Sequence, residues 1–298
     1  MSGAQPIHAE LIAVIVAVSD GAPRVLTLSD GTALPAGPLE SGHRSLQAGL
    51  RNWVERQTGH TLGHIEQLYT FADPDRSRAG RSISISYLGL TRETRTKLGG
   101  QVSWQDWYRY FPWEDRRAPA ILVESTIKPG LTRWVDDAAD RQSRAARCFA
   151  LDGAPWNEDL ALSRYELLYE AGLVREAARD GRPVHGDFAP GIAMTADHRR
   201  ILATAISRLR ATIKYRPVVF ELLPDQFTLL DLQRCIEALA GHTLHKGNFR
   251  RLIEGQTLLE ETGTLATGPG RPAKLYRFSA AIRAERAQAG TRLPLARP

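Results

Sequence analysis

The pattern of apolar residues at the start of the chain predicts a sheet. Residues 10–18, ELIAVIVAV, are almost continuously apolar and rich in β-branched side chains, and residues 24–28, RVLTL, follow a short turn. Both segments are expected to be buried, neighbouring strands. Residues 63–71 and 81–90 are also strand-like, and the second alternates serine with isoleucine, as a half-buried strand does. The segment 72–80 between them is a polar loop.

Three further segments have helical spacing. The first runs from Ser45 to Gln57 and is followed by Gly59, which can supply the left-handed residue that ends a helix. The second, at 161–181, and the third, at 196–214, are longer. The apolar face of the first helix is formed by Leu46, Leu50, Trp53 and Val54.

The helix at 196–214 is the most clearly amphipathic of the chain, with arginines beside a long apolar stripe. Such a stripe packs either inside its own chain or against the same helix of a second copy. The candidate dimer contacts are its stripe residues Ile201, Leu202, Ala205, Ile206, Leu209 and Ile213.

The C-terminal part has the element order of a winged helix-turn-helix. A helix capped by Thr228 runs to Gly241, and residues 245–256 form a second, shorter and basic helix. A strand at 258–266, a turn rich in glycine and proline, and a strand at 274–279 follow.

Composition adds little to these predicted elements, whereas the net charge indicates the kind of partner. With 298 residues, 43% apolar and 24% charged, the chain is expected to fold into two or three modules. Its net charge of +6 favours a polyanionic partner.

Cys148 and Cys235 form neither a disulfide framework nor a zinc motif and are expected to be buried. No signal peptide or membrane span is expected, so we expect a cytoplasmic protein.

The positive charge is concentrated where the winged helix is predicted. Residues 216–298 contain 12 Lys and Arg against 8 Asp and Glu. On the second helix the cations are expected to point outward, since Phe249, Leu252 and Ile253 supply a core face, and Asn248 can contact an adenine edge in the major groove. Arg271, at the hairpin tip, can enter a minor groove. The predicted DNA contacts are Lys246, Asn248, Arg250, Arg251, Arg271 and Lys274.

The helix at 45–57 resembles the helix of Nudix hydrolases, in which a row of glutamates holds the divalent cations that activate water on a diphosphate. Alignment of Gly59 with the glycine of the Nudix motif places Asn52 at its arginine and Trp53, Arg56 and Gln57 at glutamate positions. A shift by one residue matches Arg51 and Glu55 but loses the glycine. Neither register restores a metal site, so we expect no catalytic residue, no metal and no enzymatic activity.

The substituted side chains can instead donate hydrogen bonds to a phosphate without a metal. The alternative is that they are surface residues of a helix kept for packing. The candidate ligand contacts are Arg51, Arg56, Gln57 and Arg81.

Residues 66–90 and 215–278 resemble the Nudix-related transcriptional regulators, the NrtR-like proteins of bacterial NAD metabolism. Residues 107–120 and 164–177 look like a proteobacterial branch, similar to regulators of de novo NAD synthesis. The resemblance implies a homodimeric repressor that binds palindromic double-stranded operators of NAD biosynthesis or salvage genes. It also implies that the Nudix-like domain senses an adenine nucleotide, namely ADP-ribose, NAD or ATP, with no cofactor required.

The expected fold is therefore α+β: an N-terminal Nudix-like α/β/α sandwich and a C-terminal winged helix-turn-helix, joined by a helical segment. The expected boundaries are a degenerate Nudix-like domain at 1–130, a helical insert at 131–195, a linker helix at 196–215, a winged helix at 216–285 and a flexible tail at 286–298.

Other functions and sites stay open at this point. The chain could be a Nudix-type hydrolase that uses Glu40, Glu55 or Glu66, and an RNA-binding function is weakly supported because no aromatic strand pair is evident. The aromatic segment 104–115 is either a platform for adenine or, as we favour, a core cluster. His185 and Asp187 suggest a metal pair, although a histidine in a turn is the simpler interpretation.

Overall fold

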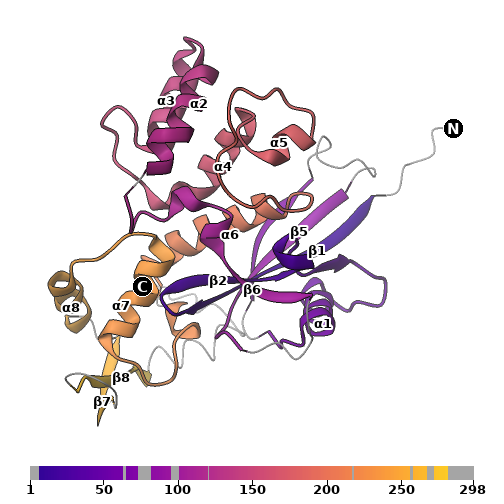
Figure 1. The fold of residues 1–298 in the computed structure, drawn as a ribbon. Helices are drawn as coiled ribbons and strands as arrows, with labels where there is room; N and C mark the ends of the chain where they lie inside the picture. The colour runs from indigo at the N-terminus through magenta and orange to yellow at the C-terminus, as the bar shows by residue number, and fades with distance from the viewer. Residues whose placement is uncertain are drawn as a thin grey trace, which may run out of the picture.

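The N-terminal strands form one mixed sheet in the computed structural model, which describes residues 7–62, 65–72, 82–94, 101–119, 121–216, 218–255, 258–266 and 272–280. The strand order is β4-β5-β1-β2-β6, and β3 pairs with β1 (Figure 1). Only the β1–β5 pair is parallel among these pairings. The strands are β1 (His8–Ser19), β2 (Ala22–Leu28), β3 (Ala36–Pro38), β4 (Ile65–Phe71), β5 (Ser82–Leu90) and β6 (Val102–Asp106).

The central strand β1 is buried on both faces, which explains its continuous apolar run. Its pairing with β5 extends from His8–Ser82 to Val16–Leu90. Alternate residues of β1 enter two separate cores, one containing Ile12 and Val14 and the other containing Leu11 and Ile15. The predicted strands are confirmed, whereas β3 and β6 had not been predicted.

The helix α1 (Leu46–Thr58) covers one face of the sheet through Leu50 and Val54. The Ser45 hydroxyl accepts a hydrogen bond from the Ala48 amide (3.1 Å), and Gly59 ends the helix with φ of +69°. The predicted helix and its glycine end are therefore confirmed.

A helical segment follows the sheet. Its long predicted helix at 161–181 is two helices, because Gly172 has φ of +67° and an added Cβ there would lie 1.8 Å from the Pro183 carbonyl oxygen. The helices are α2 (Lys128–Val135), preceded by a π-helical turn (Val123–Ile127), α3 (Ala139–Phe149), α4 (Ala161–Glu170) and α5 (Arg175–Arg179). Short 3-10 turns lie at Ser29–Gly31, Trp107–Arg109, Pro112–Glu114, Glu158–Leu160 and Val218–Glu221.

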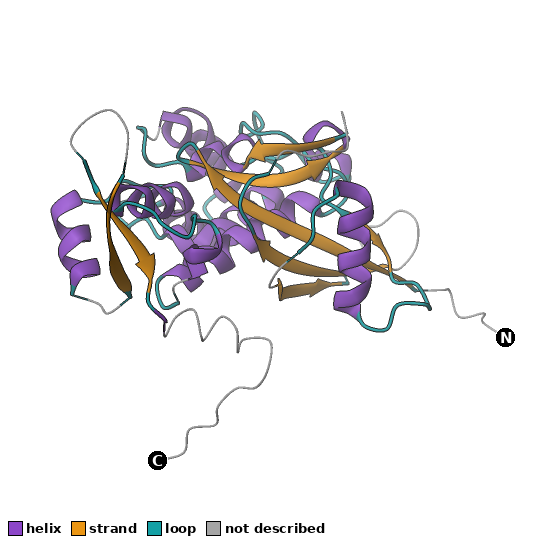
Figure 2. Ribbon diagram, turned by 90° about the horizontal axis from the view of Figure 1, so that it is seen from below, coloured by secondary structure: helices purple, strands orange, loops and turns teal. Residues whose placement is uncertain are grey.

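The helix α6 (His198–Ile213) packs against α4, β4 and β1, so helices lie on both faces of the sheet (Figure 2). Five stripe residues, Ile201, Leu202, Ala205, Ile206 and Leu209, are at most 1% exposed within the single chain, and Ile213 is half-buried. Of the two alternatives for this stripe, packing inside its own chain is the one observed, and the five buried residues cannot be dimer contacts because the chain's own core already covers them. The helix is a layer of the sandwich and not a separate linker.

The C-terminal elements are α7 (Leu229–Ala240), α8 (Lys246–Glu254), β7 (Leu259–Leu265) and β8 (Lys274–Phe278). Thr228 and Asp231 form a reciprocal capping box at the start of α7. The β7–β8 hairpin is tied to the same point, since Phe227 and Tyr276 exchange two backbone hydrogen bonds (3.0 and 2.8 Å). This unit packs on the sheet domain through contacts of α7 with β2 and α6. The predicted tail at 286–298 lies outside the described residues.

Candidate functional site

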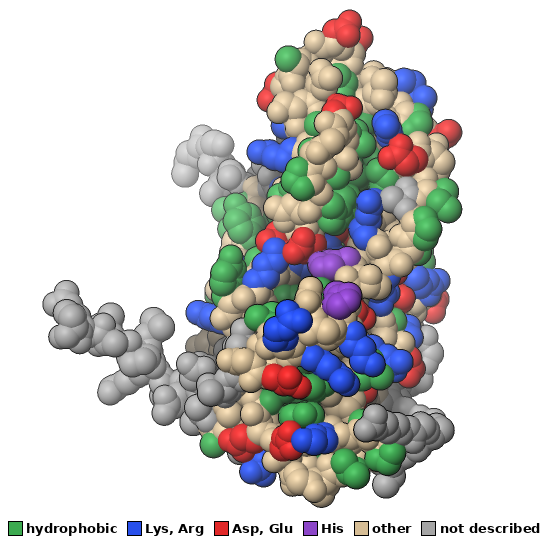
Figure 3. Space-filling model, turned by 90° about the vertical axis from the view of Figure 1, so that its left-hand side faces the viewer, with side chains coloured by type: hydrophobic (Ala, Val, Ile, Leu, Met, Phe, Trp, Pro, Cys, Tyr) green, Lys and Arg blue, Asp and Glu red, His purple; other side chains and the backbone are tan. Residues whose placement is uncertain are grey.

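The helix α8 presents its cations to solvent. Lys246, Asn248, Arg250 and Arg251 are exposed, while Phe249 is only 6% exposed and anchors the helix. Figure 3, which views the side on which α8 lies, shows Lys and Arg side chains gathered near histidines, with acidic side chains interspersed. The outward orientation of the cations, which a DNA-contacting helix requires, agrees with the prediction.

The apolar face of α8 is narrower than predicted. Leu252 is 60% exposed, whereas Ile253 is 9% exposed, so Leu252 does not belong to the core face. Successive helical residues are rotated by about 100°, so a two-residue anchor, Phe249 and Ile253, leaves Leu252 at the flank.

The two cations of the β7–β8 hairpin that the structure describes form ion pairs along the strands. The Lys274 ammonium lies 2.9 Å from a Glu261 carboxylate oxygen, and Arg277 lies 3.1 Å from Glu260. Hydrogen bonds to Glu261 raise the pKa of Lys274, so it is a cation at neutral pH. Arg271, the predicted contact at the hairpin tip, lies outside the described residues.

The predicted ligand contacts on α1 are engaged with their own chain. The Gln57 amide donates to the Ala36 carbonyl (2.7 Å) and its oxygen accepts from the Ala36 amide (3.2 Å). Arg51 donates to the Leu62 carbonyl, and the Arg56 guanidinium lies 4.6 Å from the centre of the Trp53 ring. Gln57 is thus used to hold α1 against β3. Arg81 lies outside the described residues.

Trp53, which aligns with the first glutamate of the Nudix motif, lies directly on β3. An added Cβ at Gly37 would lie 2.2 Å from its ring, and its indole nitrogen donates to the Pro38 carbonyl (3.0 Å). Because only a glycine lets the ring approach so closely, an indole occupies the space between helix and strand where a side chain at residue 37 would lie.

The three glutamates of the alternative hydrolase site, all of them described, do not belong to a group that could hold a metal ion. Glu40 lies 3.6 Å from His43, Glu66 lies 4.0 Å from Arg208, and Glu55 is exposed. Within the described parts of the chain, no group of three or more His, Cys, Asp and Glu side chains could hold a metal ion. The His185 ring nitrogen is hydrogen bonded to the Ala171 carbonyl (2.9 Å), which supports its interpretation as a turn histidine.

The aromatic segment at 104–115 is a core cluster. Trp107, Tyr110, Phe111 and Trp113 are at most 2% exposed and contact the helices and the sheet. This agrees with the favoured interpretation and leaves these four rings inaccessible to an adenine base. The cysteines Cys148 and Cys235 are free and buried, as predicted, and burial raises the pKa of both thiols, that of Cys235 to about 12.

The sequence did not predict a buried ionic cluster at the junction with α7. The Glu114 carboxylate accepts hydrogen bonds from both Arg164 (2.8 Å) and Arg210, and all three side chains are fully buried. The Arg210 guanidinium also donates to the carbonyl of Leu239 (2.8 Å) in the last turn of α7. Helical periodicity placed Arg210 beside the apolar stripe, but it gave no indication that the opposite side would also be buried.

A second buried cluster joins the start of α6 to the sheet domain. Arg199 lies 3.1 Å from Glu176 and donates to the Tyr110 carbonyl, and the Nδ1 atom of His198 accepts from the Leu34 amide (2.9 Å). Burial, aided by a nearby arginine cation, lowers the pKa of His198 to about 4. The ring is therefore neutral at physiological pH, as an acceptor nitrogen requires.

Comparison with known proteins identifies the C-terminal unit. Residues 219–278 match the family model of the NrtR DNA-binding winged helix domain. The curated ADPR responsive transcriptional repressor NtrR of Acinetobacter baylyi is 39% identical over 83 residues, which cover 28% of this chain. The matched region spans 33% of the length of that relative.

Two solved structures have the same fold over nearly the whole chain. Shewanella oneidensis NrtR in complex with a 27mer DNA is 20% identical, with a TM-score of 0.56, over 93% of this chain and 95% of its own. A MutT/nudix family protein from Enterococcus faecalis is 15% identical, with a TM-score of 0.53, over 94% of this chain and 89% of its own. At these identities the likeness shows the fold alone.

Fold and sequence together define a class of protein: a Nudix-like α/β/α domain that carries a C-terminal winged helix. Within this fold, the winged helix at residues 219–278 is of the NrtR type. The predicted fold class and family resemblance are confirmed.

Proposed function

We propose that the protein is a DNA-binding transcriptional repressor of NAD biosynthesis or salvage genes, controlled by a nucleotide. The observation that carries the proposal is the exposed row of Lys246, Asn248, Arg250 and Arg251 on the second helix of an NrtR-type winged helix. Outward cations on such a helix can bind phosphates, while an amide side chain can contact a base edge. A double-stranded operator, and with it a cytoplasmic location, follows from this proposal.

We propose ADP-ribose as the effector ahead of NAD and ATP. The curated relative from Acinetobacter baylyi is named as an ADPR-responsive repressor, and its similarity is confined to a third of its length. A ligand that releases DNA must bind the free protein more tightly than the DNA-bound protein, because the coupling is reciprocal.

A non-catalytic role is part of the proposal. At the aligned glutamate positions of α1, Trp53 lies on β3, Arg56 stacks on Trp53, and Gln57 bonds to Ala36. None of these side chains can ligate Mg²⁺ as a carboxylate does. Release of AMP from ADP-ribose that requires Mg²⁺ and is lost in Glu55→Gln would favour the alternative, a Nudix-type hydrolase.

A homodimer that binds a palindromic operator is also proposed. Since the α6 stripe is covered within one chain, the dimer would need a different surface. Two winged helices related by a two-fold axis would contact two half-sites, as paired helix-turn-helix domains do.

The test of the proposed function is binding of the full chain to promoter DNA from genes of NAD metabolism. We expect a saturable complex by fluorescence anisotropy that weakens steeply with salt, because phosphate contacts release counterions. Addition of ADP-ribose is expected to reduce the bound fraction. Equal affinity for these promoters and for random duplexes of the same length would reject a specific operator.

A further inference from the structure

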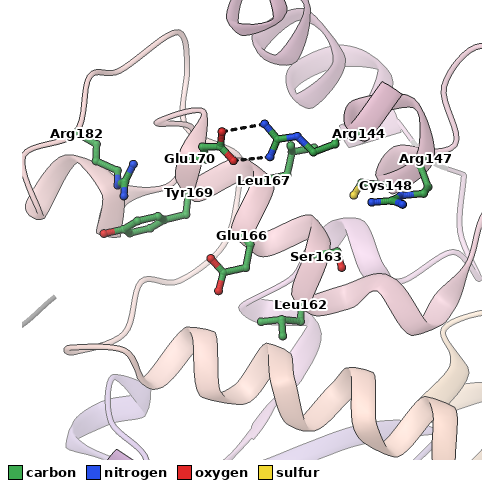
Figure 4. A pocket seen from close by; sticks show the side chains of 10 residues that line it. All are labelled: Arg144, Arg147, Cys148, Leu162, Ser163, Glu166, Leu167, Tyr169, Glu170 and Arg182. Atoms are coloured by element: carbon green, nitrogen blue, oxygen red, sulfur yellow. Dashed lines mark hydrogen bonds and ion pairs between the residues drawn. The ribbon is translucent and has the colours of Figure 1, made fainter. Parts of the chain in front are cut away.

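A cavity of about 570 Å³ lies between α3 and α4 and is closed on one side by the segment after α5. Its volume falls within the range of about 300–1,000 Å³ that is common for small-molecule sites. Figure 4 shows side chains of α3 and α4 facing this space together with Arg182. Its polar lining comprises Arg144, Arg147, Ser163, Glu166, Glu170 and Arg182.

Both carboxylates of the cavity are already paired with arginines. Glu170 accepts two hydrogen bonds from Arg144 (2.6 and 2.9 Å), and Glu166 is hydrogen bonded to Arg200 of α6. Arg147 and Arg182 are both exposed, and neither has an ion pair with a carboxylate in the parts of the chain that the structure describes. The cavity therefore has two arginine cations in excess.

One of these cations is held in place. The Arg182 guanidinium lies 4.9 Å from the centre of the Tyr169 ring, which is itself 4% exposed and hydrogen bonded through its hydroxyl to Asp180 (2.9 Å). Stacking on an anchored ring restricts the rotamers of the arginine while leaving its donors available to a ligand.

We propose that this cavity binds the phosphate groups of a nucleotide, with Arg147 and Arg182 as its anion contacts. Guanidinium groups form paired hydrogen bonds with phosphate oxygens, and such charge-assisted bonds are stronger than neutral ones. The cavity is far larger than a single phosphate, and the carboxylate of Glu166 can accept hydrogen bonds from ribose hydroxyls. The predicted alternative on α1 offers less, because both polar ends of Gln57 are bonded to Ala36.

The helix that lines the cavity also connects to the winged helix. On its other side, α4 contributes Arg164 to the buried Glu114 cluster. Arg210 of the same cluster also donates to the Leu239 carbonyl in the last turn of α7. The Leu162 amide at the start of α4 donates to the Ser207 hydroxyl of α6 (2.8 Å). A nucleotide that shifts α4 would therefore move Arg164 and disturb the buried cluster whose Arg210 is bonded to α7. This regulatory step, unlike the binding itself, rests on the proposed function.

The test measures nucleotide binding by the full chain with isothermal titration calorimetry, using ADP-ribose, ATP and inorganic pyrophosphate as probes. We expect Arg147→Gln and Arg182→Gln each to weaken binding of ADP-ribose or ATP by tenfold or more. Arg56→Gln, a matched loss of an exposed arginine on α1, is expected to bind as the wild type does. Pyrophosphate is expected to bind more weakly than the preferred nucleotide.

Three results would overturn the proposal: unchanged affinity in both cavity variants, no binding of either nucleotide by the wild type, or pyrophosphate binding as tight as the nucleotides. Operator binding by the ligand-free protein is measured separately. A protein that binds a nucleotide in the cavity but no operator would refute the proposed function and leave the site standing. Operator release that is weakened by Arg56→Gln and not by the cavity variants would place the effector site on α1.

Discussion

The carboxylate of Glu114 accepts a hydrogen bond from the Arg210 guanidinium, and neither side chain is exposed to solvent. Glu114 follows the sheet, whereas Arg210 belongs to α6 and donates a further hydrogen bond to the Leu239 carbonyl of α7. Burial by itself would raise the pKa of Glu114, but the cations of Arg164 and Arg210 outweigh it and hold the pKa below its usual value. The ionised carboxylate thus joins three parts of the chain at the base of the winged helix.

Removal of this charge is expected to destabilise the protein strongly. Glu114→Gln keeps the size of the side chain but leaves Arg164 and Arg210 buried without a counter-charge. Breaking a buried ion pair in this way costs about 3–5 kcal/mol. The free energy of unfolding in urea measures the loss.

The matched control is Glu124→Gln. Glu124 pairs with Lys128, and both side chains are largely exposed (65% and 46%), so a change of at most about 1 kcal/mol is expected. If the two variants lost similar amounts of stability, the central role of Glu114 would have to be abandoned.

The elements that the sequence predicted well are those set by local rules. Helix α1 begins after Ser45 and ends at Gly59, and α7 begins after Thr228. The side chains of Ser45 and Thr228 accept hydrogen bonds from backbone amides that a helix start leaves without partners, and Gly59 adopts the left-handed conformation that ends a helix. The continuous apolar run of β1 is likewise explained by its two buried faces. Such features need only neighbours along the chain or a single periodicity.

The candidate sites were harder to predict because they depend on distant partners. The α6 helix has an apolar stripe, yet Arg199 and Arg210 beside it are also buried, since Glu176 and Glu114 from other segments neutralise them. On α1, Gln57 was expected to face a ligand but bonds to Ala36, because β3 lies beside it. Helical spacing contains no information about either partner.

His198 gives the protein a defined sensitivity to acid. Burial lowers its folded-state pKa from 6.5 to about 4, so the unfolded chain binds a proton that the folded chain does not. The stabilising contribution is complete above pH 6.5 and is lost as the pH falls from 6.5 towards 4. A difference of this size corresponds to about 3 kcal/mol.

His198→Asn tests this directly, because asparagine can accept from the Leu34 amide without titrating. The difference in unfolding free energy between wild type and variant is measured from pH 7 to pH 4, which cancels the effect of other groups. We expect the stability of the wild type to fall relative to the variant by about 3 kcal/mol. A constant difference would mean that the ring is not held neutral.

The burial of α6 predicts a loss of stability without a change of oligomeric state. Ile206 is fully buried within one chain, so Ile206→Ala is expected to cost about 2–5 kcal/mol by leaving a cavity. Ile121→Ala, at a residue that is 67% exposed, is expected to change stability by less than about 0.5 kcal/mol. Sedimentation velocity supplies the second readout. Dissociation of a dimer by Ile206→Ala at unchanged stability would restore the dimer seam that the structure contradicts.

The two groups of basic residues in the winged helix are expected to contribute unequally to DNA binding. Arg251 on α8 is exposed, and no carboxylate lies within 4 Å of it in the described parts of the chain, whereas Lys274 is paired with Glu261. A phosphate contact by Arg251 steepens the fall of log affinity with log salt by about 0.9, and Arg251→Ala should remove that part of the slope.

Lys274→Ala should change the slope less, because the Glu261 carboxylate already offsets the charge. Lys128→Ala, which removes the same charge from α2, should leave the slope unchanged. An equal reduction in all three variants would show that net charge alone, and not the position of Arg251 on α8, governs the binding.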